Sequence, residues 1–274
     1  MIQFPDISPV AFSLGPVQVH WYGLTYLMGF LTAWWLGNQR CKPTAKLQSP
    51  IDKERFEFIV TAAMFGVIIG ARLGYVIFYD FEFLLHNPLH IFKVWQGGMS
   101  FHGGLLGVLC ALFYASRKFS LPFFTVVDFV APLVPPGLFF GRLGNFINGE
   151  LWGKVTTVPW GMVFPTGGPL PRHPSQLYEG LLEGVLLFAL LWVYSSKKRP
   201  TMAVSGFFAI GYGLFRSFVE FFRVPDAHIG YLAGGFLTMG MVLCIPLIAV
   251  GIFLVVRAYT QGLPDTPSST KARR

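Results

Sequence analysis

A cluster of polar residues follows an uncharged apolar segment near the middle of the chain. Arg142, Asn145, Asn148 and Glu150 come directly after residues 129–141, with glycines between them. A guanidinium at the centre of a bilayer costs roughly 2.5–3.5 kcal/mol on insertion scales, so an arginine near a membrane needs a partner. Glycines also let the backbone approach a ligand closely. The pattern predicts a polar pocket at the rim of a membrane; the alternative is a plain interfacial loop in which Arg142 snorkels.

A second polar group is expected on one face of a later helix. Tyr212, Arg216, Glu220 and Arg223 recur at helical spacing in an apolar segment. Such a stripe must face protein or water. An internal Arg216–Glu220 pair at i, i+4 would explain part of it, but that pair alone leaves Arg223 without a role.

Further titratable residues have types that suit proton transfer or charge pairing. His102 lies between Phe101 and two glycines. Imidazole accepts protons near neutral pH, so His102 is a candidate general base, although a lone histidine is usually structural. Glu179 and Glu183 lie one turn apart without a histidine at ligand spacing, so we expect counter-ions for the arginines and no metal site. Arg72 lies near the outer end of another apolar segment.

The composition indicates a polytopic membrane protein. Of 274 residues, 53% are hydrophobic and 12% are charged, which is about half the charged share of a soluble domain. The net charge is +8, but the basic residues fall in short clusters between apolar segments. They do not form a basic face with interleaved aromatics, so the charge is a topology signal and nucleic-acid binding is excluded.

The predicted fold is all-α, with about seven transmembrane helices. The basic residues at 40–55 predict that this loop is cytoplasmic, which places the N-terminus outside. With seven spans, the C-terminus is then expected in the cytoplasm. Residues 1–261 are expected to form a single transmembrane domain, with an interfacial arm at 80–95 and a small extracytoplasmic head at 143–174. Residues 262–274 are expected to be a disordered cytoplasmic tail. The predicted spans are Trp21–Gly37, Phe56–Tyr79, Gly97–Ser116, Pro122–Arg142, Ser175–Tyr194, Met202–Phe222 and Ala233–Val256.

The arginines that topology does not explain gather towards the outer side of the predicted bundle. A guanidinium fork suits phosphate bidentately, while apolar walls between helices suit acyl chains. The ligand class implied by these residues is an anionic phospholipid.

Read together, the polar motifs closely resemble those of the bacterial prolipoprotein diacylglyceryl transferases. The resemblance covers nearly the whole chain in family order, and several separate polar motifs are unlikely to recur by chance in an apolar sequence. The matching segments are residues 20–23 (HWYG), 97–104 (GGMSFHGG), 141–153 (GRLGNFINGELWG), 172–179 (RHPSQLYE) and 211–213 (GYG), with Arg216, Glu220 and Arg223.

The resemblance implies transfer of the sn-1,2-diacylglyceryl group of phosphatidylglycerol to the lipobox cysteine of a preprolipoprotein signal peptide. It implies an enzyme of the bacterial inner membrane, surrounded by membrane lipids, with its active site towards the outer leaflet and without a cofactor or metal. His102 would be the base, and Arg142 and Arg216 would stabilise the leaving phosphate. The substrate-binding residues would be Tyr22, Arg72, Asn145, Glu150, Gly153, Tyr212, Glu220 and Arg223.

Two other classes of function stay open at this point. A secondary transporter for an anionic solute also has Gly/Pro-interrupted spans and buried arginines. However, seven spans do not divide into even halves, and the sequence shows no internal repeat. A non-catalytic lipid-binding scaffold is the second alternative.

Overall fold

A computed structural model describes the chain at residues 2–15, 17–42, 49–93, 97–225, 230–232 and 234–262. The chain forms two compact units, of which the first comprises Met1–Gly37 and Asp128–Arg274 and the second Asn38–Val127. The predicted cytoplasmic tail lies beyond Gly262 and therefore outside the described residues.

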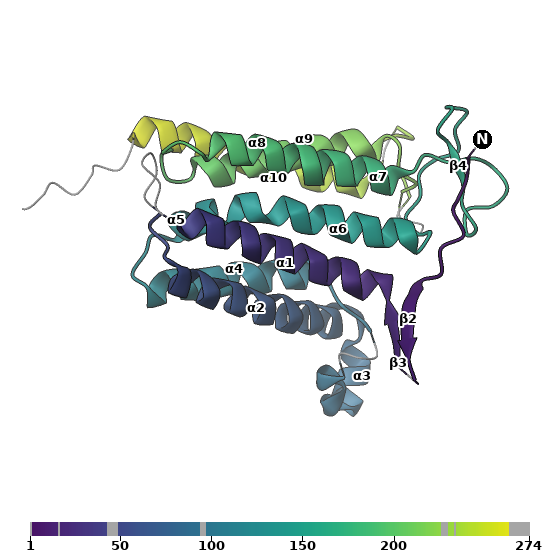
Figure 1. The fold of residues 1–274 in the computed structure, drawn as a ribbon, viewed down its shortest axis with the longest axis horizontal. Helices are drawn as coiled ribbons and strands as arrows, with labels where there is room; N and C mark the ends of the chain where they lie inside the picture. Colours follow the sequence, from purple (N-terminus) through teal and green to yellow (C-terminus); the bar gives the residue numbers. More distant parts are fainter. Residues whose placement is uncertain are drawn as a thin grey trace, which may run out of the picture. The chain divides into compact units, whose positions relative to one another are not determined.

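Helices make up most of the first unit and run alongside one another in Figure 1. They are α1 (Trp21–Cys41), most of which lies in this unit, the 3₁₀ turn η3 (Ala131–Leu133), α6 (Val134–Ile147), α7 (Ser175–Glu179), the π-helix η4 (Gly180–Leu186), α8 (Leu187–Tyr194), α9 (Ala203–Glu220) and α10 (Met239–Gln261). α5 (Phe123–Val130) begins in the second unit and ends in the first. α6 packs against η4, and α9 packs against α10. Leu187 and Leu191 of α8 form a hydrophobic core with Ala131 and Val204. These contacts bring together α6, which carries Arg142, η4, which follows Glu179, and α9, which carries Arg216 and Glu220.

The second unit is built on a pair of packed helices. Its elements are α2 (Lys53–Tyr79), α3 (Phe81–His86), the 3₁₀ helix η1 (Pro88–Phe92) and α4 (Phe101–Lys118). α2 packs along α4. The predicted arm falls on α3 and η1, while its residues 94–96 lie outside the described part of the chain.

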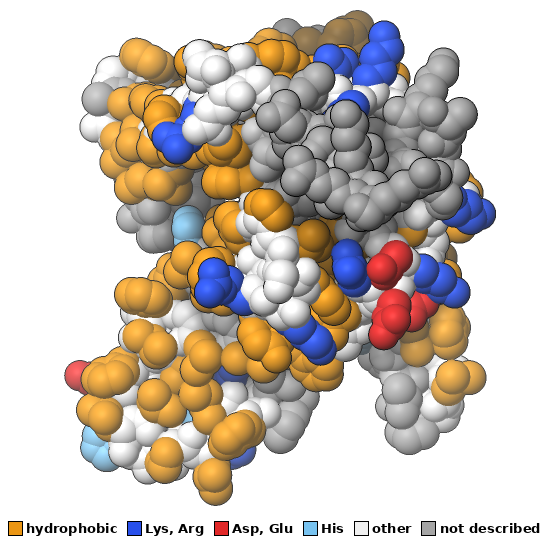
Figure 2. All heavy atoms as spheres, turned by 90° about the vertical axis from the view of Figure 1, so that its left-hand side faces the viewer, with side chains coloured by type: hydrophobic (Ala, Val, Ile, Leu, Met, Phe, Trp, Pro, Cys, Tyr) orange, Lys and Arg blue, Asp and Glu red, His pale blue; other side chains and the backbone are white. Residues whose placement is uncertain are grey.

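Several helices have the length and composition of membrane spans. Among the described residues, Lys53–Tyr79, Phe123–Ile147, Ser175–Tyr194 and Met239–Gln261 are long and apolar enough to cross a membrane. The other three predicted spans coincide with the helices α1, α4 and α9. Large apolar side chains are exposed on these helices, such as Phe78 at 77% and Val193 at 72%, and Figure 2 shows hydrophobic side chains covering much of one face. Such surface is consistent with a polytopic membrane protein.

The structure corrects the all-α prediction at the N-terminus. β2 (Val10–Leu14) and β3 (Val17–His20) form an antiparallel hairpin that leads directly into α1. β1 (Ile2–Gln3) pairs in parallel with β4 (Met162–Val163) of the head. Alternation of polar and apolar residues over so few positions is too short a signal to predict these strands.

The head also begins later than predicted. α6 continues to Ile147, so residues 143–147 at the start of the predicted head are helical. The helix continues because its polar residues find partners inside the protein: Arg142 pairs with a carboxylate, and Asn145 donates a hydrogen bond to Glu150. A polar residue with such a partner does not have to leave the membrane.

Glycines let α2 and α4 pack at close range in the second unit. Gly66 and Gly70 of α2 face Gly107 and Gly103 of α4. A Cβ at Gly107 would overlap the carbonyl oxygen of Gly66, and a Cβ at Gly70 would overlap that of Gly103. Small residues at this spacing allow membrane helices to approach closely. This packing fixes the first turn of α4, where His102 lies.

We expect Gly107→Ala to destabilise the second unit by about 1–3 kcal/mol, because α4 must move away from Gly66. Gly104→Ala is the matched control, since a Cβ at Gly104 would lie 3.5 Å from the Ala71 Cβ, which is ordinary contact. Thermal unfolding of both variants in the same detergent measures the difference. Equal shifts in Tm for the two variants would contradict the packing argument.

Candidate active site

Three arginines surround one buried carboxylate in the first unit. Glu179, at the end of α7, is 1% exposed. Its Oε1 accepts a hydrogen bond from Arg223 Nη1 at 2.7 Å and lies 3.1 Å from Arg216 Nη1, while its Oε2 pairs with Arg142 Nε. A buried carboxylate needs such partners, because an unpaired buried charge is costly. The prediction of counter-ions for the arginines is confirmed for Glu179. It is wrong for Glu183, which forms no ion pair among the described residues because the arginines pair with Glu179 and Glu220 instead.

The predicted polar stripe is present on α9 and just beyond its end. Arg216 pairs with Glu220 one turn later. Arg223 Nε lies 3.6 Å from Glu220 Oε1, so Arg223 bridges Glu179 and Glu220. This explains the arginine that an internal Arg216–Glu220 pair alone could not. We call Arg142, Glu179, Arg216, Glu220 and Arg223 the arginine cluster.

Glu220 is held in place from α10. The Thr238 hydroxyl donates a hydrogen bond to Glu220 Oε2 at 2.7 Å and accepts one from the Met241 N–H at 3.2 Å, as the N-cap of α10. Gly240 lies directly against the carboxylate, since a Cβ there would be 2.7 Å from Glu220 Oε1. Thr238 was not among the predicted site residues; a threonine just before an apolar helix is the signal that could have found it.

Small residues bring η4 close to α6, which carries Arg142. A Cβ at Gly184 would lie 2.6 Å from the Phe139 Cβ, and one at Gly180 would lie 3.7 Å from the Arg142 Cβ. η4 is a π-helix, a form that occurs mostly as single-turn interruptions and frequently at functional sites. The short distance between the helices lets Arg142 reach Glu179.

A second polar group lies around the end of α6. Asn145 Nδ2 donates to Glu150 Oε1 at 2.9 Å, and Gln176 Nε2 donates to the Glu150 carbonyl at 2.5 Å. Tyr22, in the first turn of α1, is close enough to interact electrostatically with Glu150. A Cβ at Gly144 would lie 3.1 Å from the Tyr22 ring, so a glycine is needed where α6 meets α1. The structure thus brings Tyr22, Asn145 and Glu150 together, and substrate binding by these residues stays a prediction.

Gly153 holds the head against the segment that carries Arg223. Its N–H donates to the His173 carbonyl at 2.8 Å, and it pairs with Arg223 as an isolated antiparallel bridge. A Cβ at Gly153 would overlap the Phe222 carbonyl and lie 2.8 Å from the His173 Cβ. Burial, and then the positive charge of Lys154, lower the pKa of His173, so the imidazole is neutral at neutral pH.

Arg72 belongs to the second unit, where its guanidinium group donates hydrogen bonds to backbone carbonyls. Nη1 donates to the carbonyls of Gly97 and Gly98 at 2.6 and 3.1 Å. Nη2 and Nε donate to those of His90 and Ile91 at 2.6 and 3.2 Å. These bonds tie η1 and the entry to α4 to the side of α2. Substrate binding by Arg72 stays a prediction.

His102 also belongs to the second unit, in the first turn of α4. Its side chain is exposed, and its neighbour Gly103 donates a hydrogen bond at 3.3 Å to the N-cap residue Ser100. The Phe101 ring lies edge-on to the imidazole, with the centroids 5.7 Å apart. An exposed imidazole can meet a substrate, and its role as base stays a prediction.

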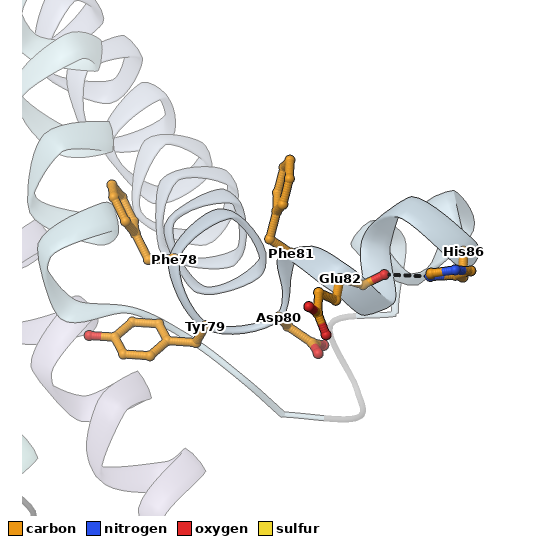
Figure 3. A pocket seen from close by; sticks show the side chains of 6 residues that line it. All are labelled: Phe78, Tyr79, Asp80, Phe81, Glu82 and His86. Atoms are coloured by element: carbon orange, nitrogen blue, oxygen red, sulfur yellow. Dashed lines mark hydrogen bonds between the residues drawn. The ribbon is translucent and has the colours of Figure 1, made fainter.

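An open hollow beside α3 does not include any of the predicted site residues. Figure 3 shows its lining side chains at the end of α2 and along α3. They are Phe78, Tyr79, Asp80, Phe81, Glu82 and His86. His86 is bonded to the Glu82 carbonyl at 2.9 Å, and Asp80 pairs with His90 at 2.9 Å. Two carboxylates at its wall make this hollow unsuited to an anion, so the arginine cluster is the better candidate for a phosphate site.

The chain is similar to a family of known proteins over nearly its whole length. The family model described as prolipoprotein diacylglyceryl transferase matches residues 9–257. Relatives named phosphatidylglycerol–prolipoprotein diacylglyceryl transferase occur in Nitratidesulfovibrio vulgaris, 61% identical over 93% of this chain and 96% of the relative. Others occur in Oleidesulfovibrio alaskensis (58%, over 93% and 94%) and Pseudomonas aeruginosa (56%, over 94% and 96%). These findings give no support to the transporter alternative.

Proposed function

The chain belongs to the prolipoprotein diacylglyceryl transferase family, and we propose that it transfers the sn-1,2-diacylglyceryl group of phosphatidylglycerol to the lipobox cysteine of preprolipoproteins. The product carries the lipid on a thioether, and glycerol phosphate is released. This reaction is the first step of lipoprotein maturation.

The proposal rests on N–H groups of the arginine cluster that form no hydrogen bond within the described residues. Arg142 pairs with Glu179 through Nε, and no hydrogen bond of its two terminal nitrogens is found in the described part of the chain. Arg216 Nη1 is buried and makes no hydrogen bond despite its ion pair with Glu179. A guanidinium group is planar and charged, and its paired N–H groups can donate to two oxygens at once. When it is held in place by ion pairs, it suits a phosphate group.

The reaction is an alkyl transfer. The cysteine thiolate attacks the glycerol carbon that bears the phosphate, a carbon–sulfur bond forms, and the carbon–oxygen bond to the phosphate breaks. Arg142 and Arg216 stabilise the charge on the departing phosphate, each by about 3–4 kcal/mol by analogy with an oxyanion-hole donor. His102 takes the proton of the thiol, whose ordinary pKa is about 8.5.

The remaining residues shape the site around the phosphate. Tyr22, Asn145, Glu150 and Tyr212 contact the headgroup, supported by the contacts of the first three at the end of α6. Glu220 and Arg223 keep the guanidinium groups in place. Gly153 keeps Arg223 in place through its backbone pairing.

The proposed setting is the inner membrane of a bacterium, with seven spans, the N-terminus outside and the site facing the outer leaflet. The basic clusters support this orientation under the positive-inside rule. Arg40 lies in the last turn of α1, Arg117 and Lys118 end α4, and Lys197 to Arg199 follow α8. Lys and Arg side chains are visible on the face in Figure 2.

A transfer assay with purified protein tests the proposed function. Phosphatidylglycerol labelled in its acyl chains is mixed with a synthetic lipobox peptide, and a peptide with serine for cysteine is the control. We expect label on the cysteine peptide only, and none when a zwitterionic lipid replaces phosphatidylglycerol. Folded protein that binds phosphatidylglycerol but labels neither peptide would favour the non-catalytic scaffold.

We expect Gly153→Ala to lower the transfer rate by tenfold or more. The added methyl group must push away the Phe222 carbonyl or His173, which displaces Arg223. A misplacement of about 1 Å can cost about 10²-fold in rate. Gly141→Ala is the matched control, because nothing lies within 4 Å of a Cβ there. Equal transfer rates in the two variants would show that the Gly153 contact does not position the site.

A further inference from the structure

Glu183 is a buried carboxyl group that the proposed mechanism does not use. It lies in η4, one turn after Glu179, and is 0% exposed. Among the described residues it forms no ion pair, and neither of its oxygens takes part in a hydrogen bond. Glu179, by contrast, has all three arginines of the cluster around it. The two carboxyl groups therefore share a helix but differ completely in their partners.

Charged and titratable groups from several helices lie near Glu183. The groups within electrostatic reach are Glu179, Arg142 of α6, Tyr212 and Arg216 of α9, Arg223, and the Cys244 thiol of α10. The guanidinium groups are already paired with Glu179 and Glu220. An ionised carboxylate without a hydrogen-bond or ion-pair partner is expensive in a buried site, and such a group usually takes up a proton instead.

We propose that Glu183 carries a proton and thereby keeps the arginine cluster at one net positive charge, which matches the single negative charge of a phosphodiester headgroup. The cluster has three arginines against the two carboxylates Glu179 and Glu220. Glu150 is not counted, because its carboxylate belongs to the separate polar group at the end of α6, where it accepts a hydrogen bond from Asn145. When Glu183 is neutral, the cluster and Glu183 together have a net charge of one positive unit. An ionised Glu183 would cancel that charge. This inference rests on the proposed function and adds a reason for selecting an anionic lipid.

Glu183 acts in this proposal through the cluster and does not touch the substrate. Its side chain is enclosed, so its contribution is to the field at the phosphate. One unit charge at short range in a partly buried site changes the affinity for an anion by about tenfold or more. A lipid without net charge gains nothing from the extra positive charge.

Infrared spectroscopy and lipid binding on the full-length protein test the proposal. We expect a protonated carboxyl band near neutral pH that is missing in Glu183→Gln. Phosphatidylglycerol binding without peptide should agree within about twofold between wild type and Glu183→Gln, because the substitution exchanges one neutral group for another. Raising the pH until the band disappears should weaken binding by wild type about tenfold and leave Glu183→Gln unchanged.

Several results would overturn the inference. If Glu183 is ionised in the native protein, wild type and Glu183→Gln will show the same protonated carboxyl bands. Glu183→Gln will then bind phosphatidylglycerol about tenfold more tightly than wild type, because the substitution removes a negative charge. Loss of the band with rising pH but without a change in affinity would contradict the charge argument. Matching Tm values for the two proteins control for folding. Wild type that binds lipid but fails in the transfer assay would overturn the proposed function instead, so the two failures are distinguishable.

Discussion

Arg142→Ala should lower the rate of diacylglyceryl transfer by about 10²–10³-fold, the usual effect of removing one preorganised donor from a developing negative charge. No hydrogen bond of the Arg142 terminal nitrogens is found among the described residues, and in the proposed mechanism they bind the substrate phosphate. Initial rates at several phosphatidylglycerol concentrations separate the effect on kcat from that on KM. We expect most of the loss in kcat, because the charge on the phosphate grows as the bond breaks.

Two further variants make this expectation specific. Arg142→Lys keeps the charge but loses the planar fork, so it should recover only part of the rate. Arg199→Ala is the matched control, because Arg199 donates to the Tyr194 carbonyl at 2.8 Å and takes no part in the arginine cluster. Equal rates for Arg142→Ala and Arg199→Ala would remove Arg142 from the mechanism.

Glu179→Gln should cost both stability and activity. The variant has the same shape, but it removes the negative charge that pairs with Arg142, Arg216 and Arg223. Breaking a buried ion pair by removing one partner typically costs about 3–5 kcal/mol, because the remaining charge is uncompensated. We expect a clear fall in Tm in detergent and loss of most transfer activity.

Glu183→Gln is the matched control for this variant, since it makes the same substitution one turn away at an equally buried position. We expect Glu183→Gln to keep its Tm and its transfer rate. Similar losses in the two variants would mean that the arginines do not distinguish between the two carboxyl groups, contrary to the observed ion pairs.

Local sequence patterns predicted the helices and part of the site. Apolar runs bounded by basic clusters located the helical spans, and helical spacing placed Arg216, Glu220 and Arg223 together. Glu179 and Glu183 were predicted together as counter-ions, and the prediction holds for Glu179 alone. The predictions that succeeded did so because each depends on residues a few positions apart along one helix.

Contacts between distant segments could not be predicted in this way. Thr238 reaches Glu220 from the start of α10, and Arg72 donates to carbonyls 18 to 26 residues further along the chain. Sequence spacing also could not separate Glu179 from Glu183, because both were candidates for pairing with arginine. Their difference arises only when α6 and α9 bring the arginines to one of them.

Product stoichiometry is the most direct test of the central claim, that the arginine cluster binds the phosphate which leaves during transfer. Thioether-linked peptide and free glycerol phosphate are measured in the same reaction, with wild type and with Arg142→Ala. We expect one glycerol phosphate for each lipidated peptide, and a parallel loss of both products in Arg142→Ala. Glycerol phosphate released without peptide, or lipidated peptide that retains the phosphate, would contradict it.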